Sequence, residues 1–247
     1  MQVLTAVVGA GTGLLLGLFG SGGTLIAMPT LHFLLHVPAR SAIAMAFGII
    51  AMTAAIATFH YWRRGAIDLR VAALFGLFGI GGAYAGARLG ALIPAPIHLA
   101  LFAATMYYSA HRLLFTDTRA DEAGMRSDHP ALIAAYGLGI GTFAGIVGVG
   151  GGFLIVPALI LLWRLPVKRA VGTSLVAVTA NSLAGFAGYT TSVAISYPIM
   201  AVFATSAVCG TFAGSALHRY LPEKTVKLAL GLFLATIATY IIGKGRV

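Results

Sequence analysis

The chain has 247 residues, and only 9% of them are charged, compared with roughly 25% in a typical soluble domain. Hydrophobic residues make up 59% of the sequence, and so few charges cannot coat a water-soluble domain of this length. Soluble, disordered, collagen-like and disulfide-scaffold proteins are thereby excluded, and a polytopic membrane protein remains.

Basic residues outnumber acidic ones, and the formal net charge is +10. In a membrane protein, short basic loops set the orientation in the bilayer, so we expect these charges to face lipid and not nucleic acid. The single cysteine, Cys209, excludes an internal disulfide.

Ten apolar elements follow one another along the chain. Several charge-free runs match the roughly 20 residues that a helix needs to span a bilayer, and none shows the alternation of barrel strands. The predicted elements cover residues 2–20, 23–36, 42–62, 69–90, 96–115, 131–148, 151–163, 170–190, 195–217 and 225–243. The sequence therefore predicts an all-α polytopic membrane protein.

The second and seventh of these elements, 23–36 and 151–163, are too short to span a membrane. Fourteen helical residues cover roughly 21 Å, whereas the hydrocarbon core is about 30 Å thick. Each short element contains a proline, Pro29 or Pro157, and follows a cluster of glycines. Each one therefore forms, with the element before it, either a broken span or a hairpin that enters the membrane and returns.

The two halves of the chain repeat each other when the sequence is shifted by 128 residues. Pro29 aligns with Pro157, and Pro38 aligns with Pro166, without any gap. Glycines align in the same register, and the pairs include Gly9 with Gly137, Gly13 with Gly141, Gly82 with Gly210, and Gly86 with Gly214. Because one register holds over most of each half, the sequence indicates an internal duplication.

Loop charges decide how the glycine-broken pairs cross the membrane. If each pair counts as one span, the 16 Lys and Arg residues divide evenly between the two sides. If each pair counts as two elements, only Arg40, Arg88, Lys244 and Arg246 lie opposite the other twelve, as the positive-inside rule requires. Each half then has five elements, an odd number, so the halves are antiparallel and both termini face outward. The sequence thus predicts two inverted repeats.

This arrangement divides the chain into three parts. The first membrane repeat covers 1–115, a polar cytoplasmic linker covers 116–130, and the second membrane repeat covers 131–247. Each repeat contains a Gly-broken short hairpin or helix pair and three transmembrane helices. The sequence leaves the oligomeric state open, a homodimer included.

Inverted repeats with paired, glycine-interrupted short segments are typical of secondary transporters, whose substrates bind at such breaks. A helix that begins after glycines presents unpaired backbone amides and about half a positive charge, and a ligand can approach its backbone closely. Such a helix tip can bind an anion without a buried Lys or Arg. Glycines at four-residue spacing elsewhere are better explained by helix packing.

The predicted substrate-binding residues lie at the two breaks and on the third element of the second half. At the breaks they are Gly20, Ser21, Gly22, Gly23, Thr24, Gly148, Gly150, Gly151 and Gly152, and on that element they are Thr173, Ser174 and Asn181. Hydroxyl and amide groups can donate hydrogen bonds to an oxyanion. The first-half counterparts of the last three are Met45, Ala46 and Thr53, so the second half is expected to supply more of the polarity.

The sequence offers no motif for an energy-coupling or catalytic centre. Nothing matches a Walker A, HExxH or GxSxG motif, and all six acids lie in loops or at predicted span ends. We therefore expect no enzyme activity, no metal and no cofactor, and we predict uniport of an anion driven by the membrane potential. The alternatives are proton coupling through a histidine, an anion channel, and a non-transporting structural subunit.

Four stretches are similar to a known family of membrane permeases, and they read GLLLGLFGSGGTLIAMPTL, FHYWRRGAIDLRVAALFGLFGIGGAYAGARLGALIP, GIGTFAGIVGVGGGFLIVPAL and VKRAVGTSLVAVTANSLAGFAGY. The chain resembles the sulfite exporter TauE/SafE family, also called the TSUP family. The resemblance implies an inner-membrane carrier for sulfur-containing anions such as sulfite or organosulfonates, often exported. Gly172-Thr173-Ser174 looks like the family pattern, whereas the first half reads Ala44-Met45-Ala46.

Overall fold

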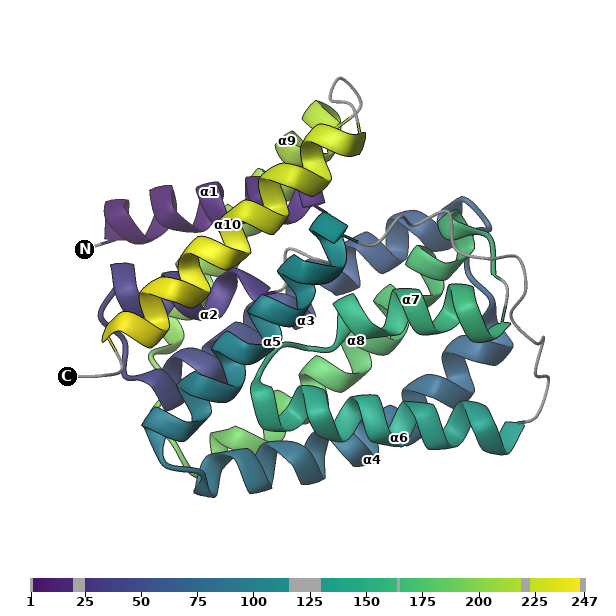
Figure 1. Ribbon diagram of the computed structural model, residues 1–247, viewed down its shortest axis with the longest axis horizontal. Coiled ribbons are helices and arrows are strands. Elements are labelled where there is room, and N and C mark those ends of the chain that lie inside the picture. Colours follow the sequence, from purple (N-terminus) through teal and green to yellow (C-terminus); the bar gives the residue numbers. More distant parts are fainter. Residues whose placement is uncertain (1, 20–24, 116–129, 164, 219–222, 245–247) are drawn as a thin grey trace.

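The computed structural model describes residues 2–19, 25–115, 130–163, 165–218 and 223–244, and Figure 1 shows them as a bundle of helices. The elements are α1 (Gln2–Phe19), α2 (Ala27–Pro29), the π-helix η2 (Thr30–Leu34), α3 (Ala39–Arg63), α4 (Leu69–Leu92), α5 (Ala95–Phe115), α6 (Pro130–Val147), α7 (Gly152–Trp163), α8 (Val167–Thr190), α9 (Tyr197–His218) and α10 (Glu223–Lys244). No strand occurs in these ranges, and the predicted all-α class is confirmed.

Several helices have the length and composition of membrane spans. Within the described ranges, α3, α4, α8 and α9 contain stretches long and apolar enough to cross a bilayer, and α1, α6 and α10 contain shorter apolar stretches. Large apolar side chains lie on the outside of the bundle: Leu77, Leu89 and Phe212 expose 66%, 54% and 56% of their surface. Such a surface fits lipid chains, and the chain is a multi-pass membrane protein.

The predicted elements match the observed helices to within three residues at each end, with one exception. The element expected at 23–36 is α2 followed by the π-helix η2. Val37 N donates to Leu31 O at 3.1 Å across the end of η2, a wider step than the four residues of an α-helical bond. This wider turn and the coil after it lead the chain into α3.

The two halves of the chain interlock through their glycine faces. α6 packs along α4, and α1 packs along α9 (Figure 1). A Cβ atom added to Gly137 would lie 2.8 Å from Phe75 O, and one added to Gly9 would lie 2.8 Å from Phe203 O. The two contacts are equivalent in the 128-residue repeat, because Gly137 aligns with Gly9 and Phe203 aligns with Phe75. In each contact, a first helix of one half meets a fourth helix of the other half.

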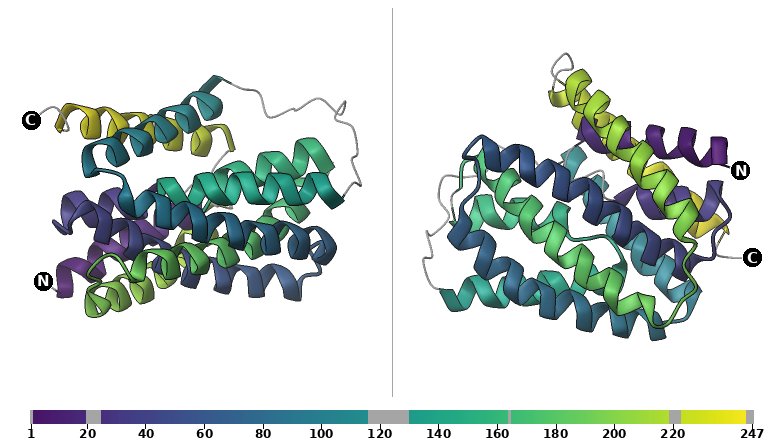
Figure 2. Two further views of the ribbon diagram at one scale, coloured as in Figure 1. Left: turned by 90° about the horizontal axis from the view of Figure 1, so that it is seen from below. Right: turned by 180° about the vertical axis from the view of Figure 1, so that it is seen from behind.

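The interior of the bundle centres on α3 and α8, which pack on each other. Residues 42–51 of α3 are buried without interruption, so this part of the helix is enclosed on all sides. α5 packs mainly on α10, and Figure 2 shows this pair as a separate layer along one side of the molecule. The centre of the fold is therefore built from the third helix of each half.

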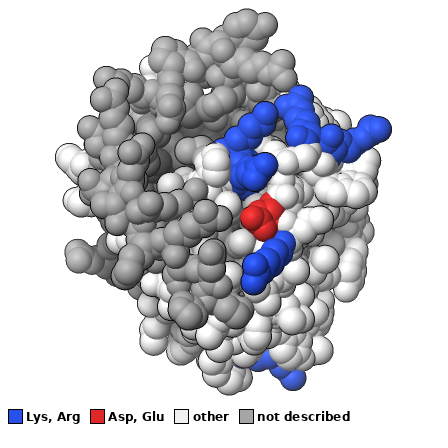
Figure 3. Space-filling view, turned by 90° about the vertical axis from the view of Figure 1, so that its right-hand side faces the viewer, with Lys and Arg blue, Asp and Glu red and all other residues white. Residues whose placement is uncertain are grey.

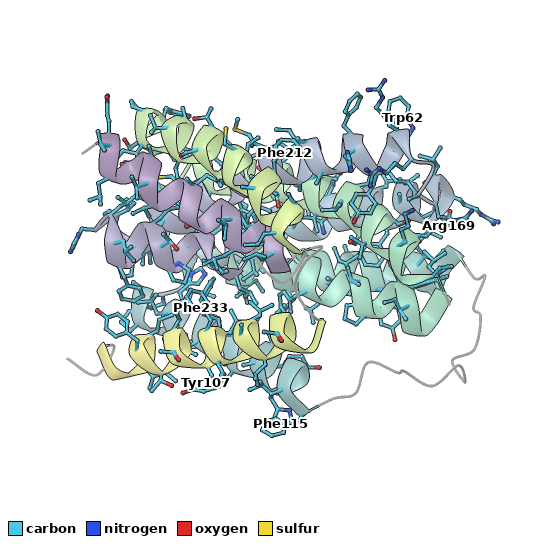
Figure 4. The ribbon with its side chains drawn as sticks, turned by 90° about the horizontal axis from the view of Figure 1, so that it is seen from above. Trp62, Tyr107, Phe115, Arg169, Phe212 and Phe233 are labelled. Carbon is cyan, nitrogen blue, oxygen red and sulfur yellow. The ribbon has the colours of Figure 1, made fainter. Side chains whose placement is uncertain are left out.

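The two ends of the bundle differ in charge. α3 ends at Arg63 and α8 begins beside Arg169, and a hydrogen bond from Asp68 N to Thr173 Oγ1 holds these segments together. Figure 3 views this end and shows basic side chains gathered near an acidic one, and Trp62 and Arg169 project from it in Figure 4. α1 begins and α10 ends at the opposite end of the molecule (Figure 1).

Candidate functional site

A tight glycine turn joins α6 to α7. Gly148, Gly150 and Gly151 have φ angles of 88°, 69° and 81°, which residues with a side chain rarely adopt. Gly148 N and Val149 N both donate to Ala144 O, at 2.8 and 3.2 Å, and these bonds end α6. The predicted break at this position is therefore present, and three of its glycines are required by the backbone.

The turn also aims the start of α7 into the protein. Leu154 N and Ile155 N donate to Gly151 O, each at 3.0 Å, and begin the hydrogen bonding of α7. The amides of Gly152 and Phe153 precede these bonds, and helical geometry gives them no partner within the helix. Residues 147–152 are all buried, so the amide end of α7 lies inside the bundle.

Two central helices enclose this turn. A Cβ atom on Gly148 would overlap Ile43 of α3. A Cβ atom on Gly150 would lie 3.2 Å from Ile50 Cγ2 of α3 and 2.8 Å from Ser182 Oγ of α8. The turn is therefore inserted between the third helices of the two halves, and only glycine fits there.

Ser182 is the polar side chain nearest to this turn, and the sequence analysis missed it. Its exposed fraction is 0%, and its Oγ has no hydrogen-bond partner among the described residues. Most other described hydroxyls inside the helices donate to a backbone carbonyl one turn earlier, as Thr179 does to Leu175 O at 2.8 Å. Ser182 instead keeps its hydroxyl available beside Gly150.

Asn181 lies next to Ser182 but faces α4. In the amide orientation that satisfies both of its polar atoms, its nitrogen donates to Gly79 O at 3.2 Å and to Ala177 O at 3.3 Å. A Cβ atom on Gly79 would overlap the Asn181 side chain, so a glycine is needed there. Asn181 thus links α8 to α4 at the level of the glycine turn.

Thr173 and Ser174 lie nearer to the start of α8 than Asn181 does, and therefore farther from the glycine turn. The eight residues from Ser174 to Ser182 correspond to about 12 Å along the helix. Ser174 Oγ donates to Val171 O at 2.8 Å, and Thr173 Oγ1 accepts a bond of 3.0 Å from Asp68 N. Both hydroxyls therefore hold backbone near the basic end of the bundle.

We expect Thr173→Val to weaken the fold without changing substrate affinity. The substitution leaves Asp68 N without its acceptor, which costs about 1–3 kcal/mol. Thermal unfolding of the purified protein should show a lower Tm, and Thr173→Ser, which keeps the hydroxyl, should restore it. A raised KM with an unchanged Tm would instead place Thr173 against the substrate.

Gly20, Ser21, Gly22, Gly23 and Thr24 lie outside the described residues. Over the described part of the chain, no three His, Cys, Asp or Glu side chains come together as a metal site would require.

The sequence is similar to a known family and to several curated proteins. The family model described as sulfite exporter TauE/SafE matches residues 5–241. A probable membrane transporter protein of Xylella fastidiosa is 30% identical, with 98% of this chain and 96% of that protein covered. The probable membrane transporter protein YdhB of Bacillus subtilis is 24% identical, with 89% and 91% covered.

A probable membrane transporter protein of Haemophilus influenzae is 29% identical, and 96% of each chain is covered. No solved structure matches the chain. The family match spans both halves, including the glycine turn between α6 and α7. The chain therefore belongs to the sulfite exporter TauE/SafE family.

Proposed function

We propose that the chain is a secondary transporter of the inner membrane that moves small sulfur-containing anions, such as sulfite or organosulfonates. The observation that carries this proposal is the buried glycine turn before α7. Positive φ angles at Gly148, Gly150 and Gly151 are costly to meet with any residue but glycine, and the turn, which precedes the free amides of α7, lies beside the buried, unpartnered hydroxyl of Ser182.

The anion in this proposal accepts hydrogen bonds from the amides of Gly152 and Phe153 and from Ser182 Oγ. The positive end of the α7 dipole contributes further attraction. All of these donors are neutral, so the anion can be released without breaking an ion pair. The 128-residue sequence repeat predicts an equivalent contribution from the cluster at 20–24, which lies outside the described residues.

The membrane potential supplies the driving force for outward movement. An inside-negative potential is worth about 2.3 kcal/mol per 100 mV for each charge moved, so a monovalent anion leaves without a coupled ion. The only described acidic side chain, that of Asp68, lies at the basic end of the bundle and not at the glycine turn. We therefore propose uniport.

The test is electrogenic transport in proteoliposomes with sulfite, sulfate, thiosulfate, sulfoacetate, taurine, chloride and acetate. We expect saturable current for sulfite or an organosulfonate that follows the imposed potential and ignores a pH gradient. Single-channel currents would show an anion channel instead. Absence of flux for every anion in folded protein would contradict the proposed substrate class.

We expect Ser182→Ala to raise the KM of the transported anion about tenfold and to leave the Tm unchanged or higher. A hydrogen bond to a charged group is worth about 1.5–3 kcal/mol, and about 1.4 kcal/mol corresponds to a tenfold change. The Tm should not fall, because the hydroxyl has no partner in the protein to lose. An unchanged KM would remove Ser182 from the site.

A further inference from the structure

A second group of polar side chains, with two buried and one partly buried, lies at the end of the bundle opposite the basic end. Arg40 is in the first turn of α3, His98 is in the first turn of α5, and Tyr189 is in the last turn of α8. His98 has an exposed fraction of 1% and Tyr189 of 0%. Three side chains that are far apart in the sequence therefore meet in the interior.

The contacts of these side chains define a compact cluster. The rings of His98 and Tyr189 are 6.5 Å apart between centroids. Tyr189 OH lies so close to Gly90 that a Cβ atom there would overlap it. Arg40 Nη2 donates to Ile93 O at 2.8 Å, and the guanidinium lies within electrostatic range of both rings.

The cluster has several unused hydrogen-bonding groups. Arg40 Nε and Tyr189 OH are buried without a partner among the described residues, and the ring nitrogens of His98 make no well-aligned hydrogen bond there, although backbone groups of Gly90, Ile146 and Val147 lie near them. Buried polar groups normally have hydrogen-bond partners, and buried charges are normally paired. Asp68, the acidic residue whose side chain the structure describes, follows the far end of α3, and that helix is about 35 Å long from Arg40 to Arg63.

The cluster also adjoins the glycine turn. The ring of His98 lies close to the backbone of Ile146 and Val147, the last residues of α6 before Gly148. Carbonyl groups at the ends of α4 and α6 carry partial negative charge, which offsets part of the charge of Arg40. A ligand held here would be next to the turn to which α7 is attached.

We propose that Arg40, His98 and Tyr189 form a second anion site, which takes a small oxyanion between the bulk phase and the glycine turn. This inference rests on the proposed function. The guanidinium supplies charge that the neutral amides of the turn lack, and His98 and Tyr189 supply directed donors. The ligand class is a compact oxyanion with several acceptor oxygens, of the size of sulfite.

The repeat predicts that the site exists at one end only. The residues aligned with Arg40, His98 and Tyr189 are Lys168, Val226 and Tyr61. Lys168 is exposed, and valine offers no donor in place of the histidine. The two faces of the transporter therefore present different groups to an arriving anion.

The first experiment measures sulfite transport by Arg40→Gln and by its matched control Arg88→Gln. Arg88 lies at the same end but is exposed, with its guanidinium bonded to Thr191 Oγ1. We expect a KM at least tenfold higher for Arg40→Gln, a Vmax within about twofold of the wild type, and no change for Arg88→Gln. Equal KM values for the two variants would overturn the proposal.

The second experiment uses Tyr189→Phe, which removes one hydroxyl and keeps the ring. We expect a several-fold higher KM for sulfite at an unchanged Tm. If Arg40→Gln does not fold, Tyr189→Phe becomes the test of the second anion site. An unchanged KM for sulfite in Tyr189→Phe would then overturn the proposal.

Ligand-induced stabilisation separates this inference from the proposed function. Sulfite should raise the Tm of the wild type in detergent, and Arg40→Gln and Tyr189→Phe should reduce that rise. Transport that Ser182→Ala impairs but Arg40→Gln and Tyr189→Phe do not would overturn only the second site. A wild type that transports none of the anions and is not stabilised by sulfite would overturn both.

Discussion

Gly150→Ala is expected to reduce anion transport more than tenfold while leaving the protein folded in the membrane. The new methyl group would lie 2.8 Å from Ser182 Oγ and 3.2 Å from Ile50 Cγ2, at the position where the anion is proposed to bind. The φ angle of 69° adds a backbone cost of about 1–2 kcal/mol for a residue with a side chain. Transport by proteoliposomes and the Tm of the same preparation measure the two effects separately.

Gly65→Ala is the matched control for the backbone cost. Gly65 also has a positive φ, of 62°, but a Cβ atom there would have nothing within 4 Å. It lies in the loop between α3 and α4, away from the glycine turn. Both variants should lose the backbone contribution, Gly150→Ala should lose further stability through its contacts with Ser182 and Ile50, and only Gly150→Ala should lose transport. Equal transport by both would mean that the turn does not hold the substrate.

Gly13→Ala is expected to lower the Tm by several degrees and to reduce the yield of folded protein. A Cβ atom at this position would overlap the backbone carbonyl of Ala207, so α1 and α9 would have to separate. Overpacking of this kind costs about 1–3 kcal/mol, and backbone atoms cannot move aside as a flexible side chain can. The measurement is thermal unfolding in a mild detergent.

Gly11→Ala supplies the control from the same helix. A Cβ atom on Gly11 would meet nothing within 4 Å, because this residue faces outward. Both substitutions gain the same helix propensity, about 1 kcal/mol, so their difference isolates the packing of α1 on α9. A Tm for Gly13→Ala that equals that of Gly11→Ala would show that this close contact does not stabilise the protein.

The helices could be predicted from the sequence because their limits are set by charge. A charged residue or a proline stands near most helix ends, as Arg63, Pro130 and Pro166 do. Spans must exclude charge from lipid, so charge-free runs mark them directly. The π-helical turn η2 was not predictable in this way, since it depends on how the chain enters α3.

The candidate site was only partly predictable. The turn at Gly148–Gly152 follows from local backbone demands, which a run of glycines reveals. Ser182 and Thr173 lie on the same helix, and the sequence cannot tell which of them faces the turn, because that depends on how α8 packs against α3 and α4. His98 lies near the start of the predicted element 96–115, and only the packing of α5 shows that its ring is buried.

The interlocked glycine faces limit how this protein can change shape. α1 belongs to the first half and α9 to the second, yet their backbones are in contact, and the same holds for α6 and α4. A rocking motion of one half against the other would break the packing of α1 on α9 and of α6 on α4 at the same time. The boundary between moving parts must therefore cut across the duplication, with each rigid part assembled from helices of both halves.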